Sequence, residues 1–362
     1  MVQRAIRSAA VWYLYFPQLW MLKRIGPRPA ILLTRAFAYA HWMMTLAGIE
    51  GRTRRAMRRA FPAMSNGELN RQLLRHLIVK YQNFVEWHLY GTPRGKKFVA
   101  ETYRLPEEGR RKLEDVLSRK RGVLALVFHY GFGKMTWAGL NEAGYTTYQH
   151  LFRGATYAGS TYPWVAKAAL EAQTRSDRDS GLGIIYQRPN LTYVLLVRHL
   201  RRNEIVGMAA DGMMGTEFVD APFLDGTMPY PTGAARAASA TGTEIVPIFI
   251  LPKGVFGHEI FVESSIPAPT SSPESVAEAV KAYVAVLDRY VRRHPYAWWT
   301  WRRLDASRGD DGKVRWLAHA LTTEEGMWHE ALGSTPERKR EEKDAAPDGR
   351  PAGSGVLETR TS

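Results

Sequence analysis

The chain has no cysteine among its 362 residues, which excludes disulfide bonds, a thiolate nucleophile and cysteine-ligated zinc. Its ten histidines include no H-E-x-x-H or similarly close pair, so the sequence predicts no metal site. Long apolar runs are missing too, because arginine, histidine or proline interrupts each one before the about 18 residues of a membrane-spanning helix. Because cysteine is absent, any covalent nucleophile in this chain would have to be a group other than a thiol.

Acidic residues are nearly absent from residues 1–60, which hold eleven Arg or Lys and one acid, Glu50, and so carry +10 of the net charge of +15. The segments Ala10–Met21 and Ala30–Met44 within this region are rich in tryptophan, tyrosine and aliphatic residues. Aromatic rings suit the depth of lipid headgroups and arginine pairs with lipid phosphates, so the sequence predicts helices that lie on an anionic membrane surface.

Three other interpretations of this region carry less weight. A signal peptide fits poorly, because Pro17 falls within the apolar run and no small-residue cleavage site follows it. Nucleic acid is not an expected partner, because aromatic runs suit lipid or a protein core better than a phosphate groove. Ordinary packed helices with basic outer faces remain the alternative.

Short strands alternate with helices from about Ser118 onward, which predicts an α/β fold with a mostly parallel central sheet flanked by helices. Strands are expected at Val123–Phe128, Tyr145–Gln149, Ile184–Tyr186, Ile205–Ala210, Ile245–Leu251 and Glu259–Glu263, with helices at 133–143, 161–175, 191–202, 232–241 and from Pro273. Upstream, Ser65 and Glu68 have the spacing of a capping box, so a long helix is expected from Asn66 to about Tyr90.

The chain is expected to divide into four parts. These are basic, aromatic membrane-interface helices (1–60), a helical lead-in (61–118), the α/β core (119–333) and a disordered tail (334–362) that is rich in charge, Gly, Pro and Ser.

His129 ends the first buried strand of the expected core, and Gly131 and Gly133 lead from it into a helix. The carboxyl ends of strands are where open α/β sheets place their chemistry. Because imidazole titrates near pH 6.5, His129 is a candidate general base toward a hydroxyl group. The alternative is a histidine that ends a strand and hydrogen-bonds the backbone.

Two further stretches suit an anionic ligand. Thr232 and Gly233 open a helix whose N–H groups can face an anion. Arg153 comes soon after the second expected strand, and its guanidinium suits a bidentate phosphate contact. The alternatives are that Arg153 pairs with a surface acid, that Arg236 lies on a solvated helix face, and that Arg302 only contacts lipid headgroups.

Blocks in the same order over about residues 10–305 resemble the bacterial lipid A biosynthesis acyltransferases, the late lauroyl and myristoyl transferases, and the related phosphatidylinositol mannoside acyltransferases. The matching blocks are the strand with His129 and Gly131, the segment Met208–Gly215 with Asp211, the block Ala221–Pro247, and the closing Trp-x-x-x-Arg-Arg that ends at Arg302 and Arg303. The family motif continues from its histidine over four residues to Asp or Glu, whereas this chain has Lys134.

The resemblance implies an acyltransferase in which His129 deprotonates a hydroxyl of a membrane glycolipid or phospholipid, which then attacks the thioester of acyl-CoA or acyl-carrier protein. It implies Asp211 as the second catalytic residue and no cofactor. The expected substrate-binding residues are Arg153, Lys134, Thr232, Gly233, Arg236 and Arg302. The expected location is peripheral or monotopic, on the cytoplasmic face of the inner (plasma) membrane.

Lys134 leaves three alternatives open. In the first, Lys134 turns away and another carboxylate, Asp211 or Glu142, orients His129. In the second, Lys134 binds a carboxylate or phosphate of the substrate. In the third, the protein is a catalytically weak or inactive lipid-binding member of the same fold. The acceptor lipid, the acyl chain length, the choice between CoA and carrier protein, and the oligomeric state are not fixed by the sequence.

Overall fold

The computed structural model describes residues 2–46, 51–151, 161–187, 191–211, 215–308 and 314–318. Its centre is a seven-stranded sheet in the order β1-β9-β8-β2-β5-β3-β4, with every neighbouring pair parallel except β8 and β9. The strands are β1 (Tyr103–Arg104), β2 (Val123–Val127), β3 (Thr147–Leu151), β4 (Gly183–Tyr186), β5 (Ile205–Ala209), β8 (Ile245–Lys253) and β9 (Gly257–Val262). The predicted α/β fold with a mostly parallel sheet is confirmed.

The helices of the core alternate with its strands along the chain: α8 (Met135–Glu142), α9 (Pro163–Ser180), α10 (Leu191–Arg201), α11 (Gly233–Thr241) and α12 (Pro273–Arg293). Their starts lie within two residues of the predicted ones, and α9 runs five residues past the predicted end at 175. The start of α12 follows its local signals: the Ser272 hydroxyl accepts a hydrogen bond from the Ser275 N–H, and Pro273 occupies the first turn.

A second, four-stranded sheet in the order β10-β11-β7-β6 was not predicted. It consists of β6 (Phe218–Phe223), β7 (Gly226–Pro231), β10 (Leu304–Arg308) and β11 (Val314–Ala318). Short 3₁₀ segments η2 (Pro295–Ala297) and η3 (Thr300–Arg303) lead into β10. The prolines in β6 and β7 hide these strands from a pattern search, because proline cannot donate to a ladder.

The N-terminal part is helical: α1 (Val2–Tyr13), a π-helical turn η1 (Leu14–Gln18), α2 (Leu19–Ile25), α3 (Pro27–Leu46), α4 (Gly51–Ala60), α5 (Asn66–Tyr90), α6 (Pro93–Thr102) and α7 (Glu107–Ser118). Pro17 lies in the π-helical turn, where its missing N–H is accommodated by a local widening of the helix. No helix in the described ranges is both long enough and apolar enough to cross a bilayer.

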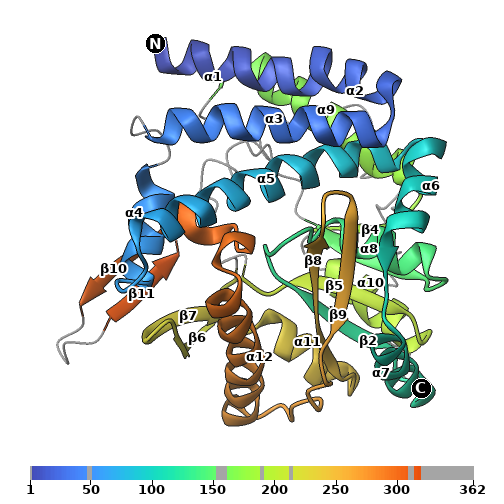
Figure 1. The fold of residues 1–362 in the computed structure, drawn as a ribbon. Coiled ribbons are helices and arrows are strands. Elements are labelled where there is room, and N and C mark those ends of the chain that lie inside the picture. The colour runs from blue at the N-terminus through green and yellow to red at the C-terminus, as the bar shows by residue number, and fades with distance from the viewer. Residues whose placement is uncertain are drawn as a thin grey trace, which may run out of the picture.

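Helix α5 has its predicted limits and crosses the carboxyl-terminal edge of the central sheet, with α1, α2 and α3 stacked beyond it (Figure 1). Ser65 caps its start by accepting from the Glu68 N–H at 3.1 Å. Along the helix, Gln82 donates to the Val255 carbonyl in the β8–β9 turn at 3.2 Å, and Trp87 donates to Asp177 of α9 at 3.0 Å. The N-terminal helices are thus fastened over the edge that carries His129.

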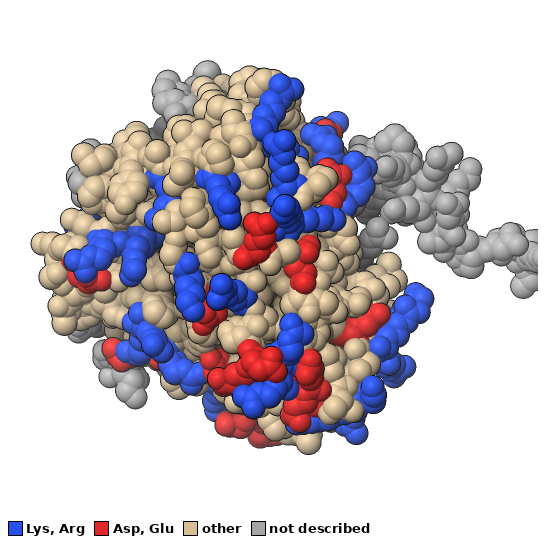
Figure 2. Space-filling model, turned by 45° about the vertical axis from the view of Figure 1, so that its right-hand side comes forward, with Lys and Arg blue, Asp and Glu red and all other residues tan. Residues whose placement is uncertain are grey.

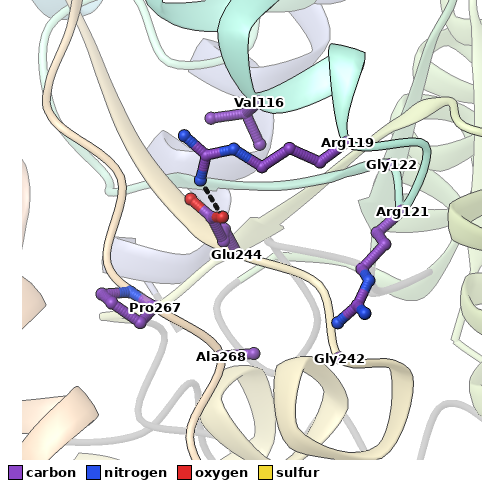
Figure 3. A pocket seen from close by; sticks show the side chains of 8 residues that line it. All are labelled: Val116, Arg119, Arg121, Gly122, Gly242, Glu244, Pro267 and Ala268. Atoms are coloured by element: carbon purple, nitrogen blue, oxygen red, sulfur yellow. Dashed lines mark hydrogen bonds and ion pairs between the residues drawn. The ribbon is translucent and has the colours of Figure 1, made fainter.

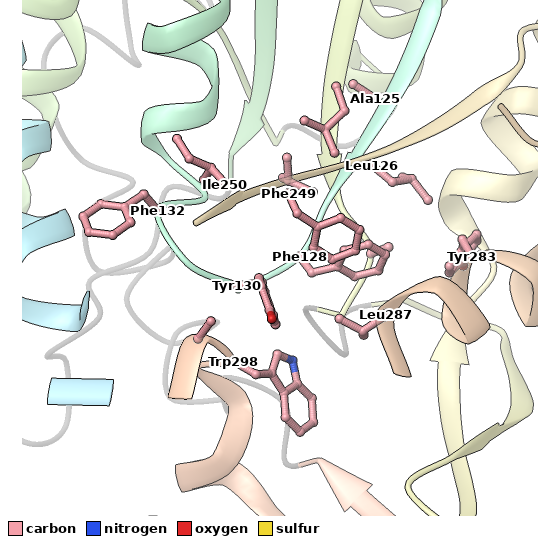
Figure 4. Packing of buried hydrophobic residues seen from close by; sticks show 14 of the residues in the cluster. Ala125, Leu126, Phe128, Tyr130, Phe132, Phe249, Ile250, Tyr283, Leu287 and Trp298 are labelled. Carbon is pink, nitrogen blue, oxygen red and sulfur yellow. The ribbon is translucent and has the colours of Figure 1, made fainter. Parts of the chain in front are cut away.

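A buried aromatic cluster lies directly beneath that edge (Figure 4). Phe128 stacks on Phe249 of β8 with ring centroids 5.3 Å apart, and Tyr130 meets Phe249 edge-on at the same distance. Such close packing leaves the loop after β2 little freedom to move.

The four predicted parts of the chain stay predictions. Residues 319–362, which include the predicted tail, lie outside the described residues. Tyr103 and Arg104, which the sequence assigns to the lead-in, add a strand to the edge of the central sheet.

Candidate active site

The loop that follows β2 is anchored residue by residue. The His129 carbonyl accepts from the Trp299 N–H at 2.8 Å, and the Gly131 N–H donates to the Ala297 carbonyl at 2.7 Å. Gly131 has φ of +56°, and a Cβ at this position would lie 1.9 Å from the Ile250 carbonyl oxygen. Only glycine fits here, so the backbone holds His129 at a fixed place at the sheet edge.

Asp211 lies beside His129, because β2 and β5 are neighbouring parallel strands that end at the same edge. Its Oδ1 is 2.8 Å from His129 Nδ1 and 2.9 Å from the His129 backbone nitrogen. The carboxylate therefore fixes both the main chain and the ring of the histidine.

Two further side chains donate to the other oxygen of Asp211: the Trp298 indole N–H at 2.9 Å and the Thr300 hydroxyl at 3.4 Å. Asp211 is 1% exposed, and this burial by itself would raise its pKa. The charge of His129 and the hydrogen bonds from His129 and Trp298 outweigh burial and lower the pKa of Asp211. Asp211 is therefore an anion at neutral pH.

An anionic Asp211 selects the imidazole tautomer with the proton on Nδ1, which leaves a lone pair on Nε2. The His129 side chain is 33% exposed, and Nε2 meets no hydrogen-bond partner within the described part of the chain. This arrangement can take a proton from a hydroxyl group that approaches from solvent.

A sequence model of the family described as bacterial lipid A biosynthesis acyltransferase matches residues 2–304. The chain belongs to this family. A search of curated proteins found no match. As a member of the lipid A acyltransferase family, the protein is an acyltransferase of lipid biosynthesis, and the family resemblance seen in the sequence is confirmed.

Lys134, at the acidic position of the family motif, is turned toward α9 and α5. Its Nζ lies 3.8 Å from Asp177 Oδ1 and 4.9 Å from the centre of the Trp87 ring. Burial lowers the pKa of Lys134, and the nearby Asp177 offsets part of that effect. The sequence left two carboxylates as possible partners of His129. Asp211 is the one that contacts the imidazole ring, whereas Glu142 accepts a hydrogen bond from the Tyr90 hydroxyl at 2.9 Å.

The other predicted site residues of this lipid A acyltransferase family member are less closely tied to His129. Thr232 precedes α11 and its hydroxyl contacts the Glu217 carbonyl at 3.4 Å, while Gly233 begins the helix with open space around it. Arg236 forms an ion pair with Glu217. Arg302 is exposed, two residues after Thr300. Arg153 lies outside the described residues, and the substrate-binding roles of all these residues stay predictions.

A cavity of about 420 Å³ lies at the opposite edge of the sheet (Figure 3). Gly122 and Glu244 line it, and they directly precede β2 and β8, so it is at the amino ends of the strands. Arg119 is paired with Glu244, and Arg121 points toward Gly242 where α11 ends. This cavity is remote from His129 and does not contribute to the candidate active site.

Trp298 and Thr300, partners of Asp211, were not among the site residues predicted from the sequence. Both lie in the aromatic segment before Arg302 that carries the family resemblance, but nothing in that segment shows which indole or hydroxyl faces the aspartate. The described residues contain no group of three or more His, Cys, Asp or Glu positioned to hold a metal ion.

Proposed function

We propose that the protein transfers a fatty acyl group from an acyl-CoA or acyl-carrier-protein thioester to a hydroxyl of a membrane glycolipid or phospholipid, with His129 as general base. The observation that carries this proposal is the pair formed by His129 Nδ1 and Asp211 Oδ1 at 2.8 Å, which leaves Nε2 free at the surface of an acyltransferase. Both residues are among those expected from the sequence.

In the proposed reaction, His129 Nε2 takes the hydroxyl proton as the oxygen attacks the thioester carbon. Asp211 stabilises the imidazolium that forms and keeps the ring oriented. The tetrahedral intermediate then collapses: the C–S bond breaks, the ester bond is complete, and the imidazolium returns its proton to the departing thiolate. The step requires neither a covalent enzyme intermediate nor a cofactor.

We further propose that the protein lies on the cytoplasmic face of the inner membrane through its N-terminal helices. Among the described side chains of α1 to α3, the large apolar ones that are exposed are Trp12, Tyr13, Trp20, Ile25, Leu32, Phe37, Tyr39, Met43 and Met44. In the upper part of the molecule, which these helices occupy, Lys and Arg stand among uncharged residues, while most acidic side chains lie lower (Figure 2). This combination suits an anionic bilayer surface.

Helix α9 adds to this surface. Arg4 Nε donates to the Thr161 carbonyl at 3.0 Å and Ser8 Oγ accepts from the Tyr162 N–H at 2.8 Å, so the start of α9 lies against α1. Trp164, with a relative exposure of 61%, stands just after these contacts. The proposed membrane surface therefore includes a tryptophan from the core as well as the N-terminal helices.

The test is acyl transfer from a labelled acyl thioester by purified protein in the presence of membrane lipid extract. We expect an acylated lipid product with the wild type and none with His129→Ala, while His199→Ala at the opposite sheet edge retains transfer. Full activity of His129→Ala would remove the proposed base. A wild type that binds the lipid but never transfers, with either donor, would instead identify a lipid-binding member that has lost the chemistry.

A further inference from the structure

Lys134 reverses the charge that the family motif carries at this position, and the structure shows what the lysine contacts instead. The residue directly precedes α8, five positions after His129 in the same loop. Its ammonium group lies between the face of Trp87 of α5 and the carboxylate of Asp177 of α9. The lysine therefore contacts the helices that cover the sheet edge.

Asp177 needs such a cation. The residue is 3% exposed, and its two oxygens accept from the Trp87 indole at 3.0 Å and the Tyr186 hydroxyl at 3.2 Å. Both donors are neutral and leave the buried negative charge uncompensated. Within the described ranges, Lys134 is the cation that ion-pairs with Asp177.

This cluster joins four elements at the carboxyl-terminal edge: Trp87 on α5, Lys134 before α8, Asp177 on α9 and Tyr186 at the end of β4. The other end of the loop is already held, because His129 is bound to Asp211 through its backbone and its ring. The six residues from His129 to Lys134 are thus fixed at both ends by a buried aspartate.

We propose that Lys134 is a positioning residue that forms, with Asp177, a clamp on the far end of the His129 loop, so that position 134 places the loop and takes no part in proton transfer. The inference rests on the proposed function for the role of the loop. It accounts for the retention of the His129–Asp211 pair in a chain that lacks the motif acid, because Asp211 orients the base and Lys134 holds the loop.

The experiment compares four variants of the full chain in the acyl-transfer assay with a labelled acyl thioester and membrane lipid extract. Lys134→Met leaves Asp177 buried and unpaired, so we expect kcat to fall about tenfold or more with little change in the KM for the thioester. Lys134→Arg keeps the charge and should stay within about threefold of the wild type.

The double variant Lys134→Met/Asp177→Asn separates a clamp from a substrate contact. It removes both charges together, and replacing a whole buried ion pair costs far less than breaking it. The clamp predicts that it recovers most of the activity and thermal stability lost in Lys134→Met. Asp177→Asn alone, which leaves the half-buried lysine without its carboxylate partner, should be impaired.

Two results would overturn the clamp. The first is a wild-type kcat in Lys134→Met. The second is a loss of kcat in Lys134→Met that the double variant does not relieve, because the ammonium group would then act on the substrate. Failure of the proposed function is distinguishable, because it removes activity from the wild type. In that case thermal unfolding still decides on the clamp: the double variant must unfold at a higher temperature than Lys134→Met.

Discussion

The backbone N–H and the ring Nδ1 of His129 point to the same oxygen of Asp211, at 2.9 and 2.8 Å. A carboxylate bound in this way fixes the position of the residue as well as the tautomer of its ring. Replacing Asp211 by Asn keeps the shape of the side chain but allows the wrong tautomer. We expect transfer to fall by about 10² to 10⁴, the contribution of a general base, and loss of the equivalent carboxylate in a serine protease costs about 10⁴. Circular dichroism and steady-state kinetics check this, and Asp211→Asn at wild-type rate would contradict it.

Trp298→Phe tests the support behind Asp211. The substitution retains an aromatic ring in a buried position and removes the indole N–H that lies 2.9 Å from Asp211. A hydrogen bond to a charged group is lost, so we expect kcat to fall about tenfold. Trp316→Phe, a buried tryptophan bound to the Leu224 carbonyl, is the matched control and should leave kcat close to that of the wild type.

Gly131→Ala should be among the most damaging single-methyl substitutions in the chain. The new Cβ would meet the Ile250 carbonyl at 1.9 Å in a backbone conformation that alanine disfavours. We expect the free energy of unfolding to fall by more than about 3 kcal/mol, with loss of transfer. Gly67→Ala, in the first turn of α5 with its nearest neighbour at 4.0 Å, should be neutral. Urea unfolding of both variants provides the comparison.

His88 predicts a pH dependence of stability. The side chain is buried on α5, its Nδ1 lies 2.5 Å from Ser176 Oγ, and burial, followed by the charges of Lys134 and Lys23, lowers its pKa to about 3. The unfolded chain binds this proton near pH 6.5, so stability contributed by neutral His88 is complete above that pH and is lost progressively from pH 6.5 toward pH 3. The full loss is on the order of 5 kcal/mol.

Urea unfolding of the wild type and His88→Asn at several pH values checks this prediction. Asparagine offers a polar atom near the position of Nδ1 and does not titrate. The free energy of unfolding of His88→Asn should therefore fall less between pH 7 and pH 5 than that of the wild type. Parallel curves for the two proteins would show that His88 does not control this range.

Vesicle flotation tests the proposed membrane surface. Trp20→Ala/Trp164→Ala removes two exposed tryptophans, and we expect binding to anionic vesicles to weaken about tenfold. Phe218→Ala removes an exposed aromatic from β6, away from this surface, and should not change binding. Wild-type binding should also weaken with salt, because salt screens the basic residues. Equal binding to neutral and anionic vesicles at all salt concentrations would remove the electrostatic contribution.

Local signals explain which parts of this fold were predictable. Ser65, Ser272 and Pro273 mark helix starts through contacts with residues only a few positions away, and β2 is a continuous apolar run. The proximity of His129 and Asp211 was also accessible, because both end predicted strands of one sheet. The prediction of a mostly parallel sheet did not specify that β8 and β9, which are neighbours in the chain, pair as an antiparallel hairpin. The second sheet was not predictable, because prolines obscure β6 and β7 and the pairing of β7 with β11 joins strands remote in sequence.

The direction of a side chain was the least predictable feature of the site. Trp298 reaches Asp211 from 87 residues away, and Lys134 reaches Asp177 only because α9 packs against α5. The sequence places Lys134 close to the candidate base. It does not decide whether the lysine contacts a protein carboxylate, binds the substrate or turns away from the site. Long-range packing of helices settles that choice, and no local pattern encodes it.

The position of β5 in the sheet affects the order in which the enzyme folds and becomes active. This strand lies between β2 and β3, although it follows both of them and β4 in the chain. His129 and Asp211 are 82 residues apart, so they meet only when β5 enters the middle of the sheet. Pairings of such long sequence separation form slowly, because the loop between them must close first. The appearance of transfer activity during refolding should therefore report completion of the sheet centre and lag behind the recovery of helix.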